Sequence, residues 1–483
     1  MSFGSSILSA DQNCMATEQS RLPFLRHYVL GELQFGGWGL VERGVGALNA
    51  LIILSALSLY EYGVLQLLLA VFGFAIGLPS LMMTFADNDV SRFIGEGRER
   101  DAKRAFLEFY GLRCVATILL AALFFFGSNI FVPKYGSEVA RFGKIIAMLL
   151  AVDVLQRLCT SLLNFRLRFA AIARRRVVQK TLQLLFLGAF VASASKVDVR
   201  VVLWSLVVGS LGMGVTMVPS AIRAYTPWRG LKAARRWILP RTFKAHGKWA
   251  SAQGLLGHAT EQVEPWLIKI FVSTEAVALF VVARSLIAAV TNFVPTRTLG
   301  TLLPMRVYDS RWSRRVFLRG VKYQVAFTFL GVLAGAAVFP LAVRLFFPKY
   351  TVALPYFYAL AGTAPIAAIG SLPVFFLRAM RRQKFLFFNR VLKTALSVPL
   401  MLIFLPILGL WGLVIERWVQ LLVKATVLVL YLKRSAPEIA LRARDLVHFG
   451  REDVEFARSA FSIGMSAVRQ RYRAVRRAVG FSP

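Results

Sequence analysis

The chain has 483 residues, 57% of them hydrophobic, and a mean hydropathy of +0.60, yet 59 Lys and Arg stand against 24 Asp and Glu. This apolar content together with a formal charge of +35 excludes an ordinary soluble domain. The charges lie in short clusters between long apolar blocks, which argues against nucleic-acid binding and is typical of the cytoplasmic loops of inner-membrane proteins. The composition therefore predicts an all-α polytopic membrane protein.

The N-terminal segment, residues 1–35, is polar at its start and holds no Lys or Arg before Arg21. It lacks the basic region and the apolar core of a signal peptide. We expect it to be a cytoplasmic leader.

Apolar blocks long enough to cross a hydrocarbon core of about 30 Å then follow one another along the chain. The basic loops alternate with loops that hold little beyond Lys134, Arg141, Lys196, Arg200 and Lys349. By the positive-inside rule, the basic loops and both termini face the cytoplasm of a bacterial inner membrane. The twelve predicted spans are 36–59, 62–86, 105–131, 138–163, 177–194, 201–222, 249–272, 276–303, 323–346, 353–377, 391–407 and 411–432.

Landmarks in the first half recur in the second at one offset. The prolines of two PKY phrases, Pro133 and Pro348, stand 215 residues apart, as do Ser58 and Ser273. Pro79 and Pro295, inside the second and eighth spans, stand 216 apart. The chain is therefore predicted to be two parallel six-helix repeats, related by an axis along the membrane normal. A lone membrane proline is ordinary, but helix kinks at Pro79 and Pro295, matched in two repeats, indicate a transport site.

The repeat divides the chain into five parts. A basic cytoplasmic linker, 223–248, joins an N-lobe, 36–222, to a C-lobe, 249–432. In the tail, 433–483, apolar residues recur every three or four positions among arginines, which predicts a basic amphipathic helix on the lipids of the inner leaflet. The alternatives for the tail are docking on the transporter's own loops or on a biosynthetic partner; no nucleic-acid partner is expected.

Several short phrases resemble the polysaccharide-transporter branch of the MOP superfamily, the Wzx-type lipid-linked oligosaccharide flippases. They are LSLYEYG after the first span, PKY before the fourth and tenth, RAMRRQK after the tenth and GLWG before the twelfth. The resemblance covers about residues 30–432. It implies two six-helix lobes forming a V around a central cavity lined by helices 1, 2, 7 and 8.

The resemblance also implies a function. A flippase of this kind moves an undecaprenyl-pyrophosphate-linked oligosaccharide repeat unit from the inner to the outer leaflet by alternating access, for O-antigen, exopolysaccharide or capsule synthesis. A polysaccharide polymerase and glycosyltransferases are the implied partners. One alternative is a MATE-like ion-coupled exporter of small cationic compounds. Another is a membrane-embedded glycosyltransferase, polymerase or ligase, but such enzymes usually need a large loop or soluble domain, and none is visible.

Positive charges inside the spans are candidates for binding a pyrophosphate head, because intramembrane charges are costly and usually functional. Arg43 and Arg284 are the first choices, since a guanidinium fork matches phosphate, and Lys269 is the second. The alternative is internal ion pairing, through Glu42–Arg43, Asp153–Arg157 or Glu416–Arg417. For Asp153–Arg157 this alternative is favoured, because i,i+4 is a standard helix pairing.

Four polar residues are predicted to line the cavity or to couple transport to H⁺ or Na⁺ entry: Glu42, Glu261, Glu264 and Asn292. Glu261 and Glu264 share a helix face, and the alternative is that they only neutralise nearby arginines. The sequence has no phosphate-binding loop and no zinc-type metal motif, so we expect a secondary transporter without a cofactor or a metal.

Small and sulfur-containing residues in the spans have a simpler interpretation. The GxxxG steps Gly73–Gly77 and Gly331–Gly335 predict close helix packing. Cys14, Cys114 and Cys159 show no pairing pattern, and the last two are expected to pack inertly in apolar segments.

Overall fold

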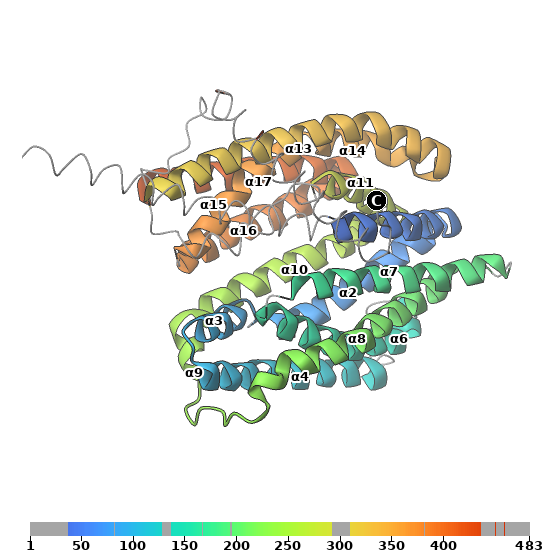
Figure 1. Ribbon diagram of the computed structural model, residues 1–483. Helices are drawn as coiled ribbons and strands as arrows, with labels where there is room; N and C mark the ends of the chain where they lie inside the picture. The colour runs from blue at the N-terminus through green and yellow to red at the C-terminus, as the bar shows by residue number, and fades with distance from the viewer. Residues whose placement is uncertain are drawn as a thin grey trace, which may run out of the picture.

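A computed structural model describes residues 37–435 apart from 82, 128–136, 167, 194–195, 292–309 and 381, together with Gly450 and Arg458. The predicted leader, the PKY phrase of the first half, Asn292, Pro295 and nearly all of the tail lie outside the described residues. The described part forms two bundles of long helices that lie one above the other in Figure 1.

The first bundle is built from the helices of the first half. They are the helix Gly37–Ala56, α2 Leu59–Ser80, α3 Met83–Gly95, α4 Glu99–Gly127, α6 Ser137–Phe165, α7 Phe169–Ala192 and α8 Val199–Arg229.

The second bundle follows a short connection, α9 Leu239–Thr242 and the π-helical turn η1 Phe243–Gly247. Its elements are α10 Lys248–Phe271, α11 Thr274–Thr291, α13 Ser310–Phe346, the 3₁₀ turn η2 Pro348–Ala353, α14 Leu354–Ala361, α15 Thr363–Ala379, α16 Gln383–Leu408 and α17 Leu410–Ser435.

Each predicted span coincides with one of these helices. Within the described residues, eight helices are long and apolar enough to cross a membrane, and α14 with α15, bent by 49°, makes a ninth. The remaining predicted spans correspond to α7, α10 and α17, which carry charged side chains. The prediction of an all-α polytopic fold in two bundles is confirmed.

The two serines that stand 215 residues apart do the same work. Ser58 caps α2: its Oγ accepts from the Glu61 amide at 3.2 Å, and its own amide donates to Glu61 Oε2 at 2.9 Å. This is a capping box, which satisfies two otherwise unpaired amides. Ser273 caps α11 and accepts from the Ala276 amide at 3.1 Å. The second helix of each bundle thus begins at the same kind of residue.

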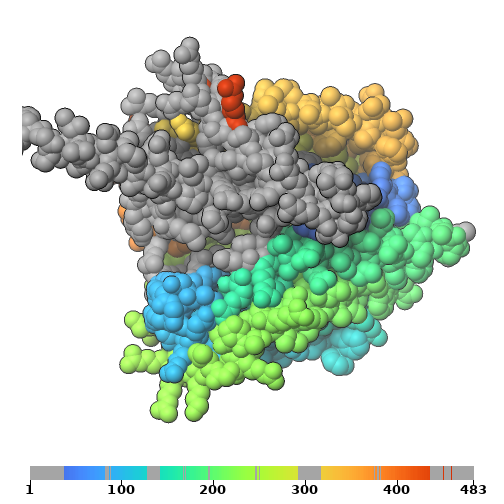
Figure 2. Space-filling view, viewed as in Figure 1, coloured from blue at the N-terminus to red at the C-terminus, as the bar shows by residue number. Residues whose placement is uncertain are grey.

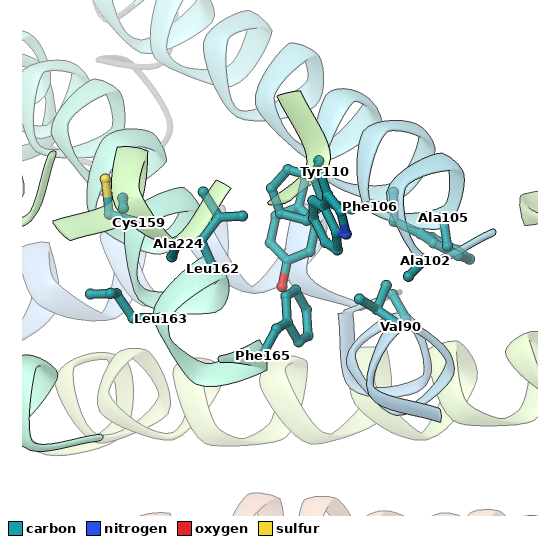
Figure 3. Packing of buried hydrophobic residues seen from close by; sticks show 14 of the residues in the cluster. Val90, Ala102, Ala105, Phe106, Tyr110, Cys159, Leu162, Leu163, Phe165 and Ala224 are labelled. Carbon is teal, nitrogen blue, oxygen red and sulfur yellow. The ribbon is translucent and has the colours of Figure 1, made fainter. Parts of the chain in front are cut away.

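Aromatic packing holds one end of the first bundle together. Phe106 and Tyr110 of α4 stack with ring centroids 4.7 Å apart, and Phe165 of α6 meets both edge-on (Figure 3). Such ring pairs contribute about 0.5–1.5 kcal/mol beyond their buried area. Cys159, a free cysteine, is buried in the same cluster, which confirms its inert packing.

The segment predicted as a linker docks on the first bundle. Lys103 Nζ donates to the Trp228 and Leu231 carbonyls, both at 2.7 Å. The Glu108 carboxylate accepts from the amides of Ile238 at 3.0 Å and Leu239 at 2.8 Å, where α9 begins. The connection is therefore held against α4 rather than extended between the bundles.

Helix α2 meets the second bundle through its glycines. A Cβ at Gly73 would lie 2.8 Å from the Gln262 side chain of α10, and one at Gly77 would lie 2.8 Å from His258. Gly331 and Gly335 of α13 likewise leave room for Val290 of α11. Both GxxxG steps are close helix contacts, as predicted, because the missing side chains let the helices approach.

Substituting Gly209 should destabilise the fold. A Cβ at Gly209 of α8 would lie 2.8 Å from the Gln179 carbonyl, which is backbone and cannot rotate away. Gly209→Val is expected to cost about 1–3 kcal/mol, as overpacking usually does, and to lower the unfolding temperature in detergent. Gly188→Val in α7 is the control, since a Cβ there meets no described atom within 4 Å. Equal melting of the two variants would contradict the packing.

Candidate functional site

A buried carboxylate ties three helices of the second bundle together. Glu264 of α10 has a side chain only 4% exposed. Arg417 Nη2 of α17 lies 2.9 and 3.1 Å from its two oxygens, and Arg284 Nη1 of α11 lies 3.3 Å from Oε1. Glu264 stands seven residues before the end of α10, about 10 Å along the helix axis, so these charges lie within the length of the bundle.

The two arginines that face Glu264 differ in exposure. The Arg417 side chain is 21% exposed and makes both of the shorter bonds. The Arg284 side chain is 51% exposed and makes the single longer one. Arg417 therefore neutralises the carboxylate, and Arg284 is the more accessible guanidinium.

A second carboxylate lies on the same helix as Arg417. Glu416 is fully buried, and its Oε1 accepts from Ser397 Oγ and, at 3.0 Å, from Gln420 Nε2. Its Oε2 has no hydrogen-bond partner among the described residues. Glu416 interacts electrostatically with Arg417, Glu264 and Lys393.

Helix α16 adds further cations. Arg390 Nη2 lies 3.0 Å from Glu261 Oε1, and the lack of a side chain at Gly257 leaves room for this guanidinium. Lys393, one turn along α16, interacts electrostatically with Arg390, Arg417 and Lys424. We call the whole set the charged cluster: Glu261, Glu264, Arg284, Arg390, Lys393, Glu416, Arg417 and Lys424.

The charged cluster carries an excess of positive charge. Its five Arg and Lys against three Glu give a formal charge of +2. A site of this kind favours an anion over a cation, because a cation would have to displace arginines already hydrogen-bonded to the carboxylates.

The other predicted cavity residues lie elsewhere. Lys269 lies over the Trp266 ring, 5.5 Å from its centroid, near the end of α10. Arg43 and Glu42 are partly buried on the helix Gly37–Ala56, and Glu42 interacts electrostatically with Lys180 of α7. The structure thus brings Arg284, Glu261 and Glu264 into one cluster, and it places Arg43 and Glu42 on the first bundle.

The predicted helix kink at Pro79 lies at an interruption of the chain. Helix α2 ends at Ser80, one residue later, and α3 begins at Met83. Its predicted counterpart Pro295 lies outside the described residues, so the matched pair stays a prediction.

The first bundle holds its own ion pairs. Arg157 Nε donates to Asp153 Oδ1 at 3.1 Å, as the i,i+4 spacing predicts, and Arg113 Nη2 lies 3.5 Å from Oδ2. Tyr110 donates to Asp87 of α3, and burial nevertheless raises the pKa of the Asp87 carboxyl. This set has as many acids as bases.

Sequence reasoning missed Arg113, Arg390 and Lys393 as members of these networks. Arg113 and Lys393 interrupt apolar segments, YGLRCVATILL and VLKTALSVPL, and that interruption was the available signal. Arg390 stands one residue before a predicted span, where a basic loop was an equally good interpretation.

An apolar groove of about 290 Å³ lies between α11 and α13. It is lined by Val290, Phe327, Gly331, Ala334, Gly335, Val338 and Phe339. No charged side chain lines it, so it does not belong to the polar site.

Comparison with known proteins supports the fold. No known family profile matches the sequence, and no curated protein is significantly similar to it. Among solved structures, an inward-facing multidrug resistance MATE family transporter of the MOP superfamily matches with a TM-score of 0.62 and 14% identity, over 81% of this chain and 96% of that one. The lipid II flippase MurJ, in an inward closed conformation, matches with a TM-score of 0.62 and 14% identity, over 93% of each chain.

The fold is that of the MOP-superfamily transporters. A further match is a MOP superfamily transporter from Pyrococcus furiosus, described as having a binding pocket of reverse polarity that suggests a different function. Its TM-score is 0.58 at 15% identity, over 86% of this chain and 97% of that one. At such identities the likeness concerns the fold alone, so the choice between branches of the MOP superfamily depends on the site.

Removing the charge of Glu264 should destabilise the second bundle. Glu264→Gln leaves Arg417 buried without its counter-charge, which typically costs about 3–5 kcal/mol. Glu261→Gln is the matched control, three residues away on the same helix, because its 49% exposed ion pair is worth about 1 kcal/mol or less. Thermal unfolding in detergent compares the two variants. Equal loss in both would show that Glu264 does not organise the cluster.

Proposed function

We propose that the protein is a flippase for an undecaprenyl-pyrophosphate-linked oligosaccharide repeat unit. The observation that carries this proposal is the charge of the cluster, five cations against three carboxylates, with Arg284 half exposed. A pyrophosphate is a doubly charged anion, and arginine binds phosphate through two parallel N–H groups. The MOP fold supports a transporter rather than an enzyme.

Transport by alternating access follows from this arrangement. The carboxylate of Glu264 holds the Arg284 guanidinium in place, which limits the side-chain entropy lost when a phosphate binds. The phosphate would then compete with Glu264 for the N–H donors, so binding would be reversible, as transport requires. The predicted boundaries of the N-lobe, the linker and the C-lobe are part of this proposal.

The finer calls about the cell biology remain part of the same proposal. The protein would work in the bacterial inner membrane with both termini in the cytoplasm, in O-antigen, exopolysaccharide or capsule synthesis. Its neighbours in the pathway would be glycosyltransferases and a polysaccharide polymerase, and its basic tail would lie on the inner leaflet. H⁺ or Na⁺ entry is the proposed energy source.

A MATE-like exporter of small cations is the second candidate. The carboxylates of Glu261, Glu264 and Glu416 favour it, and MATE transporters match the fold as well as MurJ does. Against it, Arg417 and Arg390 already occupy two of these carboxylates.

Arg284 should be needed for transport at normal protein levels. Arg284→Ala leaves Glu264 paired with Arg417, so the fold should persist while polymer output from a complemented deletion strain falls at least about tenfold, as expected for loss of a charged contact. Arg157→Ala is the matched control: its side chain is equally exposed, and Asp153 keeps Arg113. Arg43→Ala is expected to reduce output as well. Full output in both Arg284→Ala and Arg43→Ala would refute the site assignment.

Substrate class separates the two candidates. Proteoliposomes that contain the purified chain should move an isoprenyl-diphosphate-linked sugar between leaflets and should not accumulate a cationic dye, because a surplus of arginines repels cations. Movement can be followed by the accessibility of the sugar to a lectin. Accumulation of the dye without movement of the sugar would favour the exporter.

A further inference from the structure

The PKY phrase of the second half connects the two bundles. Lys349, in η2, extends its side chain to the end of the helix Gly37–Ala56 in the first bundle. Its Nζ donates to the carbonyls of Ser55, at 2.9 Å, and Leu57. The last carbonyls of a helix lack partners within the helix and carry partial negative charge, so an ammonium group stabilises them.

The neighbouring residue makes a second contact between the bundles. Tyr350 is fully buried, and its ring meets Tyr62 of α2 edge-on, with centroids 5.9 Å apart. The Tyr350 hydroxyl has no hydrogen-bond partner among the described residues. A buried hydroxyl without a partner costs free energy, which the ring contact and the Lys349 bonds must offset.

The backbones also come close at this end. A Cβ at Gly63 of α2 would lie 2.1 Å from the Thr274 carbonyl of α11. The capping box of Ser58 fixes Glu61 beside this contact, and Glu61 interacts electrostatically with Lys349. Three kinds of contact, a capped helix end, an aromatic pair and a close backbone approach, thus hold the bundles together at one end.

Most of the helix Gly37–Ala56 lies exposed between that end and the other. Leu54, near its last residue, packs against the cluster that includes Tyr350 and Val343, whereas Leu40, Val41 and Leu48 are exposed. In Figure 2 its blue surface lies between the orange surface of α13 and the green surface of the first bundle. The contact with Lys349 is therefore placed to control whether this helix follows the second bundle or leaves it.

We propose that Lys349 and Tyr350 form a releasable latch between the bundles, at the end that the sequence predicts to face outward, and that the bundles separate there only when Lys349 leaves the helix end. The role in outward opening rests on the proposed alternating access. The existence of the latch does not.

Hydrogen exchange of the purified full chain in detergent tests the latch. In Lys349→Met the stem stays but the charge and the donors are lost, so exchange in residues 50–62 and 272–280 should become about tenfold faster. Exchange in residues 228–242, at the opposite end, should not change. Lys349→Arg, which keeps a cation, should restore slow exchange.

Lys196→Met is the matched control, because Lys196 lies at the same end, 3.8 Å from Glu61, with an 83% exposed side chain. Unchanged exchange in Lys349→Met, or equal acceleration in Lys196→Met, would overturn the latch. The sugar-movement assay judges the flippase separately: faster exchange in a chain that moves no lipid-linked sugar would leave the latch standing and remove the proposed function.

Discussion

The pairing of Glu264 with Arg417 and Arg284 is the interaction on which the second bundle depends. A carboxylate within the hydrocarbon thickness is unfavourable unless a counter-charge reaches it. Here the counter-charges come from two other helices, so the ion pair fixes the relative positions of α10, α11 and α17. The cost of removing charge from water has become a constraint on how the helices pack.

The same helices serve two partners. One face of α10 lies against the glycines of α2, through His258 and Gln262, and another carries Glu261 and Glu264 toward α16 and α17. Asn49 of the first bundle stands 215 residues before Glu264, and it too bonds across to the fifth helix of its repeat, through the Lys180 carbonyl. The repeats therefore preserve the position of a polar contact while changing its charge.

The fold was largely predictable because its signals are local. Apolar blocks, alternating basic loops and the paired caps at Ser58 and Ser273 each depend on residues near one another in sequence. The site was less predictable, because ion pairs form between residues such as Glu264 and Arg417 that lie far apart in the chain. Intramembrane charge identified Arg284 and Glu264 as candidates, but no pattern indicated that Arg390 would pair with Glu261. The pattern at PKY gave an interfacial helix end, and only the three-dimensional arrangement reveals its partner.

The docked connection changes how the two bundles are tied to each other. Glu108 and Lys103 fasten residues 228–239 to α4, and Thr242 donates to Asp89 of α3 at 2.9 Å. What remains between this anchored stretch and α10 is the π-helical turn Phe243–Gly247. A segment that reads as a long flexible tether is in mechanical terms a short pivot, and any rotation of one bundle against the other is concentrated in that single turn.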